Sequence, residues 1–264
     1  MMEKPQLFIV KIGGAVIDDE AALQQFTQGF ATIPAAKILV HGGGRMATTV
    51  AEGMGIQQQL VGGRRITDAE TLKVVTMVYA GWINKQVVAL LQAKGCHAVG
   101  LSGADGNVIL ANKRQADGIN YGFAGDVLAV NVQLLTQLID QNATPVLCPI
   151  THDGAGQLLN TNADTIASEV AKTLAKNYRV RLLYCFEQNG VLSNRHNPDS
   201  VIREITPQAF VALKAGGVVS DGMLPKLENA FAAVDSGVER VVIGAAQNLA
   251  AMVNGNSGTA IING

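Results

Sequence analysis

Two short apolar runs of the sequence end in glycines and cations. The first leads into Lys11, Gly13 and Gly14, and the second ends in a histidine, three glycines that include Gly43 and Gly44, and an arginine. Either cluster alone is compatible with a tight turn. Glycine also lets the backbone approach a ligand closely, and N–H groups at a strand-to-helix turn bind anions. Because the pattern recurs at two strand ends, it favours an anion site at the sheet edge where α/β proteins bind ligands.

A third group of polar residues stands where a helix is expected to begin. Asn160, Asn162 and Asp164 alternate along an extended segment, which points their side chains to one side. Amide groups can hydrogen-bond a ligand carboxylate, and Asp164 can hold nearby lysines in place. The alternative is that Asn162 only caps the helix. A cap contributes about 1 kcal/mol and leaves Asn160 and Asp164 unexplained.

The glycine-rich segment 216–226 leads into a further helix with Pro225 and Lys226 in its first turn. A lysine there is unfavourable against the helix dipole, and a bound anion would remove the conflict. The segment therefore favours a second cationic contact for an anion. The alternative is a solvated lysine on a surface helix.

Short β-rich runs alternate with segments of helical periodicity along the chain. The sheet that these runs form must position the three groups of residues. Strands are expected at 7–10, 37–40, 98–101, 145–148, 180–186 and 240–243, and helices at 20–30, 45–53, 67–94, 131–140, 162–175, 207–214 and 225–236. The alternation predicts an α/β fold, a three-layer αβα sandwich with a central, mainly parallel open sheet. Small hairpin strands are expected at 108–110 and 127–129. A polar patch near residue 177 suggests two lobes, 1–176 and 177–264.

The composition is that of an ordinary globular protein. Of the 264 residues 48% are hydrophobic, and the formal net charge is −1. Lysines and arginines are spread along the chain, so we expect no nucleic-acid or membrane partner. The apolar start is too short for a signal peptide, and no uninterrupted apolar stretch reaches about 18 residues, so we expect a cytoplasmic protein. Cys96, Cys148 and Cys185 have no paired spacing and are expected to be buried thiols.

Several well-known motifs are absent from the sequence. There is no GxxxxGK[ST] loop, no GxGxxG turn with a downstream acidic partner, and no GxSxG, HExxH or paired-cysteine site. A P-loop kinase, a dehydrogenase and a serine hydrolase are therefore poor fits.

Five motifs are similar, in order and approximate spacing, to those of the N-acetyl-L-glutamate kinases, a branch of the amino acid kinase family. They are KIGG at 11–14, HGGG at 41–44, GRRIT at 63–67, NTNAD at 160–164 and SDGMLPK at 220–226. The likeness continues to the end of the chain. It implies an open αβα sandwich whose N-terminal lobe binds the acylated glutamate and whose C-terminal lobe binds ATP with Mg²⁺.

The resemblance also implies a role for each matched residue. Lys11 and Lys226 would flank the transferring phosphoryl group, and Asp164 would orient them. The other candidates are substrate contacts at Gly43, Gly44, Arg65, Asn160 and Asn162, and phosphate or nucleotide contacts at Gly13, Gly14 and Gly222. No protein side chain is expected to bind metal, because Mg²⁺ would be held by the ATP phosphates.

The expected reaction is ATP-dependent phosphorylation of the γ-carboxylate of an N-acyl-L-glutamate, with N-acetyl-L-glutamate as first choice, in arginine biosynthesis. A γ-carboxylate needs no general base at pH 7, but two anionic reactants must be neutralised by cations and N–H donors. Carbamate kinase is one alternative. Another is N-succinyl-L-glutamate kinase, in which Arg45 or Arg64 would pair with the second carboxylate. A catalytically silent regulator is expected to lack a key lysine, and both are present.

Two segments bear on partners and on the nucleotide. The expected helix at 67–94 has more than one apolar stripe, which favours burial of one side and contact of the other with a second subunit. The alternative is a helix buried within one chain or broken at Gly81. The resemblance implies that arginine-inhibited members of the family carry an extra N-terminal helix that links dimers into hexamers. Only ten residues precede Lys11 here, so we predict a homodimer without feedback inhibition by arginine. The resemblance implies that the loop 184–190 borders the nucleotide and contains an aspartate, which this sequence lacks. The adenine contacts therefore stay open, with Glu187 as one replacement and a simple surface loop as the other possibility.

Overall fold

The computed structural model describes residues 3–61, 63–115, 118–194, 196–219 and 223–263. Its main sheet has eight strands, and neighbouring strands are parallel except for one antiparallel pair, β13 with β14. In sheet order the strands are β12 (Glu204–Ile205), β14 (Thr259–Ile261), β13 (Arg240–Ala245), β11 (Arg179–Phe186), β1 (Gln6–Ile12), β2 (Ala36–His41), β8 (Thr144–Leu147) and β5 (Ala98–Leu101). Every strand predicted for the main sheet overlaps one of these, and the mainly parallel sheet is confirmed.

Strand β1 lies inside the sheet because it is apolar on both faces. Leu7 and Ile9 belong to one buried cluster, and Phe8, Val10 and Ile12 belong to the other. Since successive side chains of a strand point to opposite faces, such a strand needs helices on both sides.

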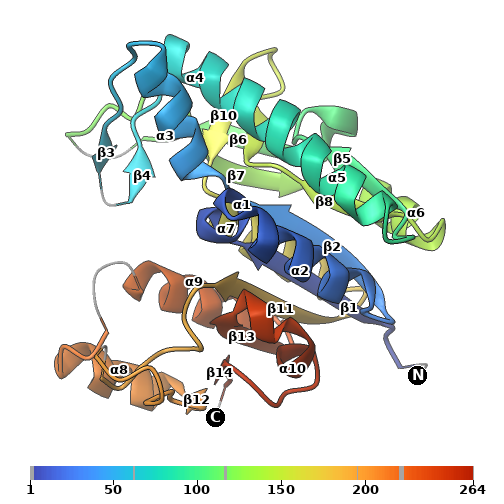
Figure 1. The fold of residues 1–264 in the computed structure, drawn as a ribbon, viewed down its shortest axis with the longest axis vertical. Helices are drawn as coiled ribbons and strands as arrows, with labels where there is room; N and C mark the ends of the chain where they lie inside the picture. The colour runs from blue at the N-terminus through green and yellow to red at the C-terminus, as the bar shows by residue number, and fades with distance from the viewer. Residues whose placement is uncertain (1–2, 62, 116–117, 195, 220–222, 264) are drawn as a thin grey trace.

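Helices cover both faces of the sheet, which confirms the three-layer αβα sandwich (Figure 1). One layer contains α1 (Gly14–Asp18), α2 (Glu20–Ala31), α3 (Gly44–Gly53), α4 (Ala69–Thr76), α5 (Asn84–Gln92) and α10 (Leu249–Val253). The other contains α6 (Val132–Asp140), α7 (Ala163–Leu174), α8 (Pro207–Ala215) and α9 (Leu224–Asp235).

Two smaller sheets accompany the main one. A closed barrel is formed by β10 (Leu158–Thr161), β7 (Ala124–Val130), β6 (Ile109–Lys113) and β9 (Ile150–His152). The predicted hairpin strands are β6 and β7, which pair antiparallel as expected. The short strands β9 and β10 were not predicted, because three or four residues give no usable periodicity. The third sheet is the hairpin of β3 (Leu60–Val61) and β4 (Arg64–Arg65).

The long apolar helix is continuous from Ala69 to Gln92, because a π-helical segment, η1 (Met77–Ile83), joins α4 to α5. Val75, Tyr79 and Ile83 are buried and follow one another at four-residue intervals, a spacing that places side chains on one face of a helix. By length and composition alone this helix could cross a membrane, but one side of it packs in the core of the sandwich.

The start predicted for this helix at residue 67 is wrong. The Thr67 N–H donates to the Tyr121 carbonyl oxygen at 3.1 Å, so Thr67 is held in an extended bridge beside the barrel. Asp68 caps the helix instead, with its Oδ1 accepting from the Thr71 N–H at 2.7 Å. The alternative of a break at Gly81 is also wrong, since the helix continues through it.

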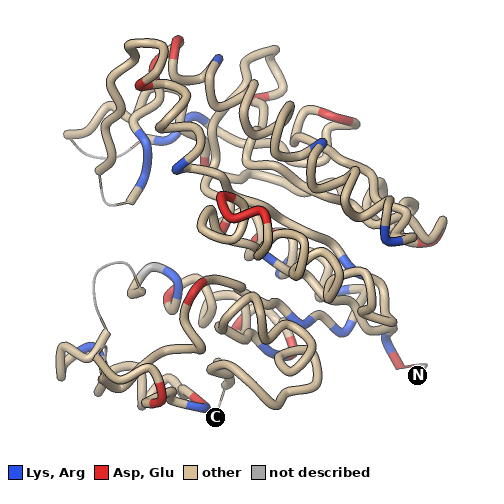
Figure 2. Tube along the Cα trace, viewed as in Figure 1, with Lys and Arg blue, Asp and Glu red and all other residues tan. Residues whose placement is uncertain are grey.

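The cysteines and charges follow the sequence-based expectations. Cys96, Cys148 and Cys185 are free and buried, and burial raises the pKa of the last two to about 12. Figure 2 shows lysines, arginines and acidic residues scattered over the whole trace. Within the described ranges, no group of three His, Cys, Asp or Glu side chains is arranged to hold a metal ion.

The predicted lobe boundary at residue 177 falls between α7 and β11. Because β11 pairs with β1, the main sheet continues without interruption past this point. The division into two lobes therefore stays a prediction.

Candidate active site

The two glycine turns lie side by side at the carboxyl edge of the main sheet. Strands β1 and β2 are parallel neighbours, with Ile12 paired to His41. The Gly42 N–H donates to the Ile12 carbonyl oxygen at 3.1 Å, and a Cβ built on Gly14 would stand 3.7 Å from the Gly44 nitrogen. Helix α3 begins at Gly44, so its first N–H groups have no intrahelical partner and can bind an anion.

Gly43 has a backbone conformation that other residues rarely adopt, with φ at +139°. A Cβ at this position would lie 2.2 Å from Cδ1 of Ile83 and 3.3 Å from Cδ1 of Tyr79. Both side chains come from η1. The π-helical segment is therefore packed directly against the second glycine turn, and only glycine fits at the contact.

Replacing Gly43 by alanine is expected to lower the free energy of unfolding by about 2 kcal/mol, because the new Cβ meets Ile83 and the backbone is strained. Urea denaturation measures the effect. Gly53→Ala is the control, since no atom lies within 4 Å of a Cβ placed there. Equal stability of the Gly43→Ala variant and the unmodified protein would contradict the packing described above.

Asp164 stands between the two predicted lysines, and we call Lys11, Asp164 and Lys226 the lysine–aspartate cluster. The Lys11 Nζ lies 2.7 Å from Oδ1 of Asp164, and the Lys226 Nζ donates to Oδ2 at 2.5 Å. Burial alone would raise the pKa of Asp164, but the two ammonium groups outweigh it and hold that pKa well below its usual range. The cluster therefore carries one net positive charge at neutral pH.

Three elements of the fold position the lysine–aspartate cluster. Lys11 lies on β1, Asp164 in the first turn of α7 and Lys226 in the first turn of α9. Asn162 caps α7, and its Oδ1 accepts from the Asp164 N–H at 2.8 Å. Tyr184 on β11 donates to the carbonyl oxygen of Asp164 at 3.1 Å, and burial raises the pKa of this tyrosine well above its usual value. Asp164 is thus positioned by α7, by the Asn162 cap and by Tyr184 on the neighbouring strand.

His41 supports the second glycine turn from inside the protein. Its Nδ1 lies 2.8 Å from the carbonyl oxygen of Gly42, and its Nε2 lies 3.2 Å from Nδ2 of Asn84, which also donates to the Val146 carbonyl oxygen. A carbonyl only accepts, so Nδ1 carries the proton and Nε2 accepts from the amide. Burial lowers the pKa of His41 to about 4, so the ring is neutral at pH 7.

Acid is expected to destabilise the protein through His41. Its pKa is near 6.5 in an unfolded chain and about 4 in the fold, so the unfolded chain binds the proton first as the pH falls. This contribution is fully present above pH 6.5 and is lost between pH 6.5 and 4, about 3 kcal/mol in all. Urea denaturation across this pH range measures it. His41→Asn should flatten the pH dependence, whereas the same change at exposed His97 should not; identical profiles would contradict the assignment.

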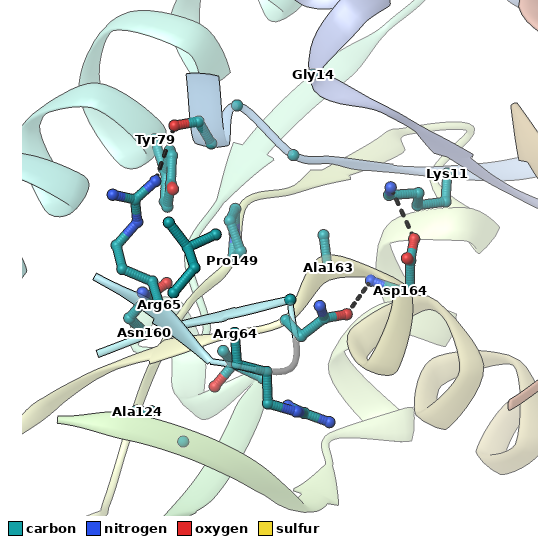
Figure 3. Close-up of a pocket in the computed structure, with 18 residues that line it drawn as sticks. Lys11, Gly14, Arg64, Arg65, Tyr79, Ala124, Pro149, Asn160, Ala163 and Asp164 are labelled. Atoms are coloured by element: carbon teal, nitrogen blue, oxygen red, sulfur yellow. Dashed lines mark hydrogen bonds and ion pairs between the residues drawn. The ribbon is translucent and has the colours of Figure 1, made fainter. Parts of the chain in front are cut away.

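Lys11 and Asp164 of the lysine–aspartate cluster border one side of a pocket, and Arg65 lies at another side (Figure 3). The guanidinium of Arg65 donates to the carbonyl oxygen of Gly44 and the hydroxyl of Thr48, both at 2.9 Å, and to the side-chain oxygen of Gln58. All of these acceptors are neutral. In the part of the chain that the structure describes, no carboxylate therefore balances the charge of this buried arginine, which suits it to bind a ligand carboxylate.

The pocket gathers nearly all residues predicted to contact the substrate or phosphate. They are Lys11, Gly14, Gly43, Gly44, Arg65, Asn160, Asn162 and Asp164. Lys226 reaches Asp164 without lining the pocket. Gly13 does not line it either, and its N–H is used in a 3.1 Å bond to the carbonyl oxygen of Cys185. Gly222 lies outside the described residues.

Some pocket residues had no recognisable signal in the sequence. Tyr79 belongs to the buried side of η1 and looked like an ordinary core residue, whereas Ala124 and Pro149 are brought to the pocket by the barrel. Of the two arginines proposed for a second carboxylate, Arg64 lines the pocket. Arg45 is exposed and lies 3.8 Å from Glu187, so Arg45 is not part of the pocket wall.

The sequence profile of the amino acid kinase family matches residues 6–245, and the chain belongs to this family. Over nearly its whole length it is similar to acetylglutamate kinases. It is 54% identical to that of Phocaeicola vulgatus, over 98% of this chain and 99% of the relative, and 52% identical to that of Cytophaga hutchinsonii, over 95% and 96%.

Solved structures of lower identity share the fold. The structure of smu.665 from Streptococcus mutans matches with a TM-score of 0.81 at 24% identity, covering 98% of this chain and 99% of that one. Carbamate kinase from Giardia lamblia bound to AMP-PNP matches with a TM-score of 0.72 at 15% identity, covering 99% of both chains. At these identities the likeness concerns the fold alone.

Proposed function

We propose that this chain is an ATP-dependent kinase that phosphorylates the γ-carboxylate of an N-acyl-L-glutamate such as N-acetyl-L-glutamate, in arginine biosynthesis. The observation that carries the proposal is the lysine–aspartate cluster beside a pocket whose other side holds Arg65. The acetylglutamate kinases at 52% and 54% identity support the same reaction. Carbamate has no second carboxylate for Arg65, so the geometry does not favour a carbamate kinase.

The pocket residues can bind and orient such a substrate. Arg65 and Asn160 would hold the α-carboxylate, which places the γ-carboxylate toward Lys11. That carboxylate is already ionised, so no residue needs to remove a proton. The two lysines and the N–H groups of Gly14 and Gly44 would stabilise the negative charge shared by attacking, transferring and leaving oxygens.

ATP would supply the phosphoryl group, and Mg²⁺ would neutralise part of the phosphate charge. The net positive charge of the lysine–aspartate cluster and the N–H groups at the start of α3 fit a polyphosphate. We infer that the phosphates rather than protein carboxylates hold Mg²⁺, that residues 177–264 bind the nucleotide, and that the protein acts in the cytoplasm without a membrane or nucleic-acid partner.

A coupled assay of ADP release tests the proposal. The purified chain with ATP and Mg²⁺ should release ADP with N-acetyl-L-glutamate and release little with glutamate, aspartate or carbamate. Hydroxylamine should trap the acyl phosphate as a hydroxamate. Binding of N-acetyl-L-glutamate without any ADP release would instead identify a silent ligand-binding protein and contradict the proposed activity.

We propose further that two copies pair through the exposed side of helix Ala69–Gln92. Met77 and Trp82 are 54% and 63% exposed there, and both are large apolar side chains on the side opposite the core. Light scattering should give the mass of a dimer, and Trp82→Glu should give that of a monomer, because a charge cannot be buried in an apolar contact. A wild-type monomer or hexamer would contradict this.

In the same preparation, low-millimolar arginine is expected not to inhibit the release of ADP.

A further inference from the structure

The two glycine turns bring the backbone N–H groups of Gly14, Gly43 and Gly44 close together. A Cβ built on Gly14 would stand 3.7 Å from the Gly44 nitrogen and 3.9 Å from the Gly43 nitrogen. Within the described part of the chain, none of these three N–H groups is bonded to a backbone carbonyl oxygen. All three residues line the pocket. N–H groups gathered in this way form a concave site for an anion.

The direction of the Gly43 N–H is set by a hydrogen bond on the buried side of the turn. The carbonyl oxygen of Gly42 lies 2.8 Å from Nδ1 of His41, whose side chain is fully buried. The peptide bond is trans and planar, so the Gly42 carbonyl and the Gly43 N–H point in opposite directions. Because the carbonyl points to the buried imidazole, the N–H points toward the pocket.

This peptide needs a fixed partner because both of its flanking residues are glycines. A glycine adopts positive and negative φ with similar ease, so the peptide between Gly42 and Gly43 can turn over at little steric cost. Turned over, it would present a carbonyl oxygen to the pocket, and this oxygen would repel a phosphate. The hydrogen bond from His41 therefore decides which end of the peptide dipole faces the ligand.

Asn84 makes the imidazole of His41 a donor toward Gly42. The Lys85 Nζ donates to Oδ1 of Asn84 at 3.1 Å, so the amide nitrogen is the end that faces His41. This nitrogen lies 3.2 Å from Nε2 of His41 and donates to the Val146 carbonyl oxygen at 3.0 Å. Nε2 therefore accepts, and the proton of the neutral ring is on Nδ1. Asn84 is only 1% exposed, so water does not compete for this contact.

We propose that His41 is a positioning residue for phosphoryl transfer, whose Nδ1–H holds the Gly42 carbonyl so that the Gly43 N–H donates to a phosphate oxygen. The inference rests on the proposed function and adds to it two buried residues, His41 and Asn84, that do not line the pocket. An N–H fixed in advance stabilises the charge of the transition state without reorganisation.

The chemical step itself is unchanged by this role. An oxygen of the γ-carboxylate forms a bond to the γ-phosphorus of ATP, and the bond from that phosphorus to the β,γ-bridging oxygen breaks to release ADP. The proton of His41 stays on Nδ1 throughout.

Two amide substitutions of His41 test the inference. Asparagine places its Nδ2 near the position of the histidine Nδ1 and can still donate to Gly42, whereas glutamine places its nitrogen near the position of Nε2 and cannot. With N-acetyl-L-glutamate, kcat should fall about 100-fold in His41→Gln, as the loss of one donor costs. In His41→Asn it should stay near the wild-type value. KM for N-acetyl-L-glutamate should change little, because Arg65 is held by other groups.

The comparison separates positioning from a general loss of stability. Leu135→Ala is the control, since Leu135 is buried in the cluster on the other face of the sheet. It should destabilise the fold in urea and leave kcat unchanged. Equal kcat in His41→Gln and His41→Asn, whether both high or both low, would overturn the inference, because the retained donor would then make no difference.

A spectroscopic measurement tests the same contact without turnover. In protein labelled with ¹⁵N-glycine, MgATP added without an acceptor substrate should move the amide proton resonance of Gly43 downfield. The shift should persist in His41→Asn and be absent in His41→Gln. The wild-type result stands even if His41→Gln fails to fold.

The two levels of inference fail differently. If the wild type releases ADP but the Gly43 resonance does not respond to MgATP, only the inference about His41 is wrong. If the folded wild type releases no ADP with any acylated glutamate, the proposed function itself is wrong.

Discussion

Lys11→Ala and Lys226→Ala are each expected to lower kcat roughly 100-fold or more while the protein stays folded. Each lysine places an ammonium group where phosphoryl charge must be stabilised, and removal of one such donor costs at least this much. Asp164 keeps the other lysine as a partner in each variant, so the buried carboxylate is not left unpaired. The ADP-release assay at saturating substrate measures kcat, and circular dichroism checks the fold.

Lys73→Ala is the matched control for this pair of variants. Lys73 is 68% exposed on α4 and pairs with Glu70, so its loss should leave kcat unchanged. Near-normal kcat in either Lys11→Ala or Lys226→Ala, in a folded protein, would reject the assignment of the lysine–aspartate cluster as the catalytic site.

Asp164→Asn is expected to lower kcat by a similar factor and also to destabilise the fold. Asp164 now bridges the ammonium groups of Lys11 and Lys226. Without its carboxylate, two positive charges are left unpaired in a largely buried place, which costs about 3 kcal/mol. The pKa of Asp164 is held well below its usual range, so the stability it contributes is present above about pH 4 and is lost only in stronger acid. The destabilisation should therefore be the same at pH 5 and at pH 8.

This pH independence separates Asp164 from His41, whose contribution changes between pH 6.5 and 4. Urea denaturation of Asp164→Asn at both pH values measures it. Asp140→Asn, an exposed change at the end of α6, is the control for loss of a carboxylate. If Asp164→Asn kept normal stability and normal kcat, Asp164 would not be the residue that orients the lysines.

Much of the fold could be predicted because its signals are local. The runs 7–10, 38–40 and 182–186 are apolar at every position, and such strands must be covered on both faces. The caps of α6 and α7 are also local signals, because an asparagine stands just before each of these apolar helices. Predictions went wrong where a distant segment intervened, as at Thr67, whose backbone pairs with the chain near Tyr121.

The residues of the candidate site also divide into those with a local signal and those without one. Lys11, Gly43 and Asn162 could be singled out by residue type and spacing, because turns and caps are made by neighbouring residues. Tyr79 could not, since a tyrosine on an apolar helix stripe resembles any core residue until the π-helical turn places it against Gly43.

The sequence by itself determined which residues could do chemistry, namely a lysine after a strand, a lysine at a helix start and an aspartate that follows two asparagines. Only the tertiary structure decided that they meet. Lys226 and Asp164 are 62 residues apart in the chain and join through a 2.5 Å bond, and Arg64 came to share Asp126 with Arg114 in the same manner. The physical reason is that the order of strands depends on packing across the whole core, which no local periodicity encodes.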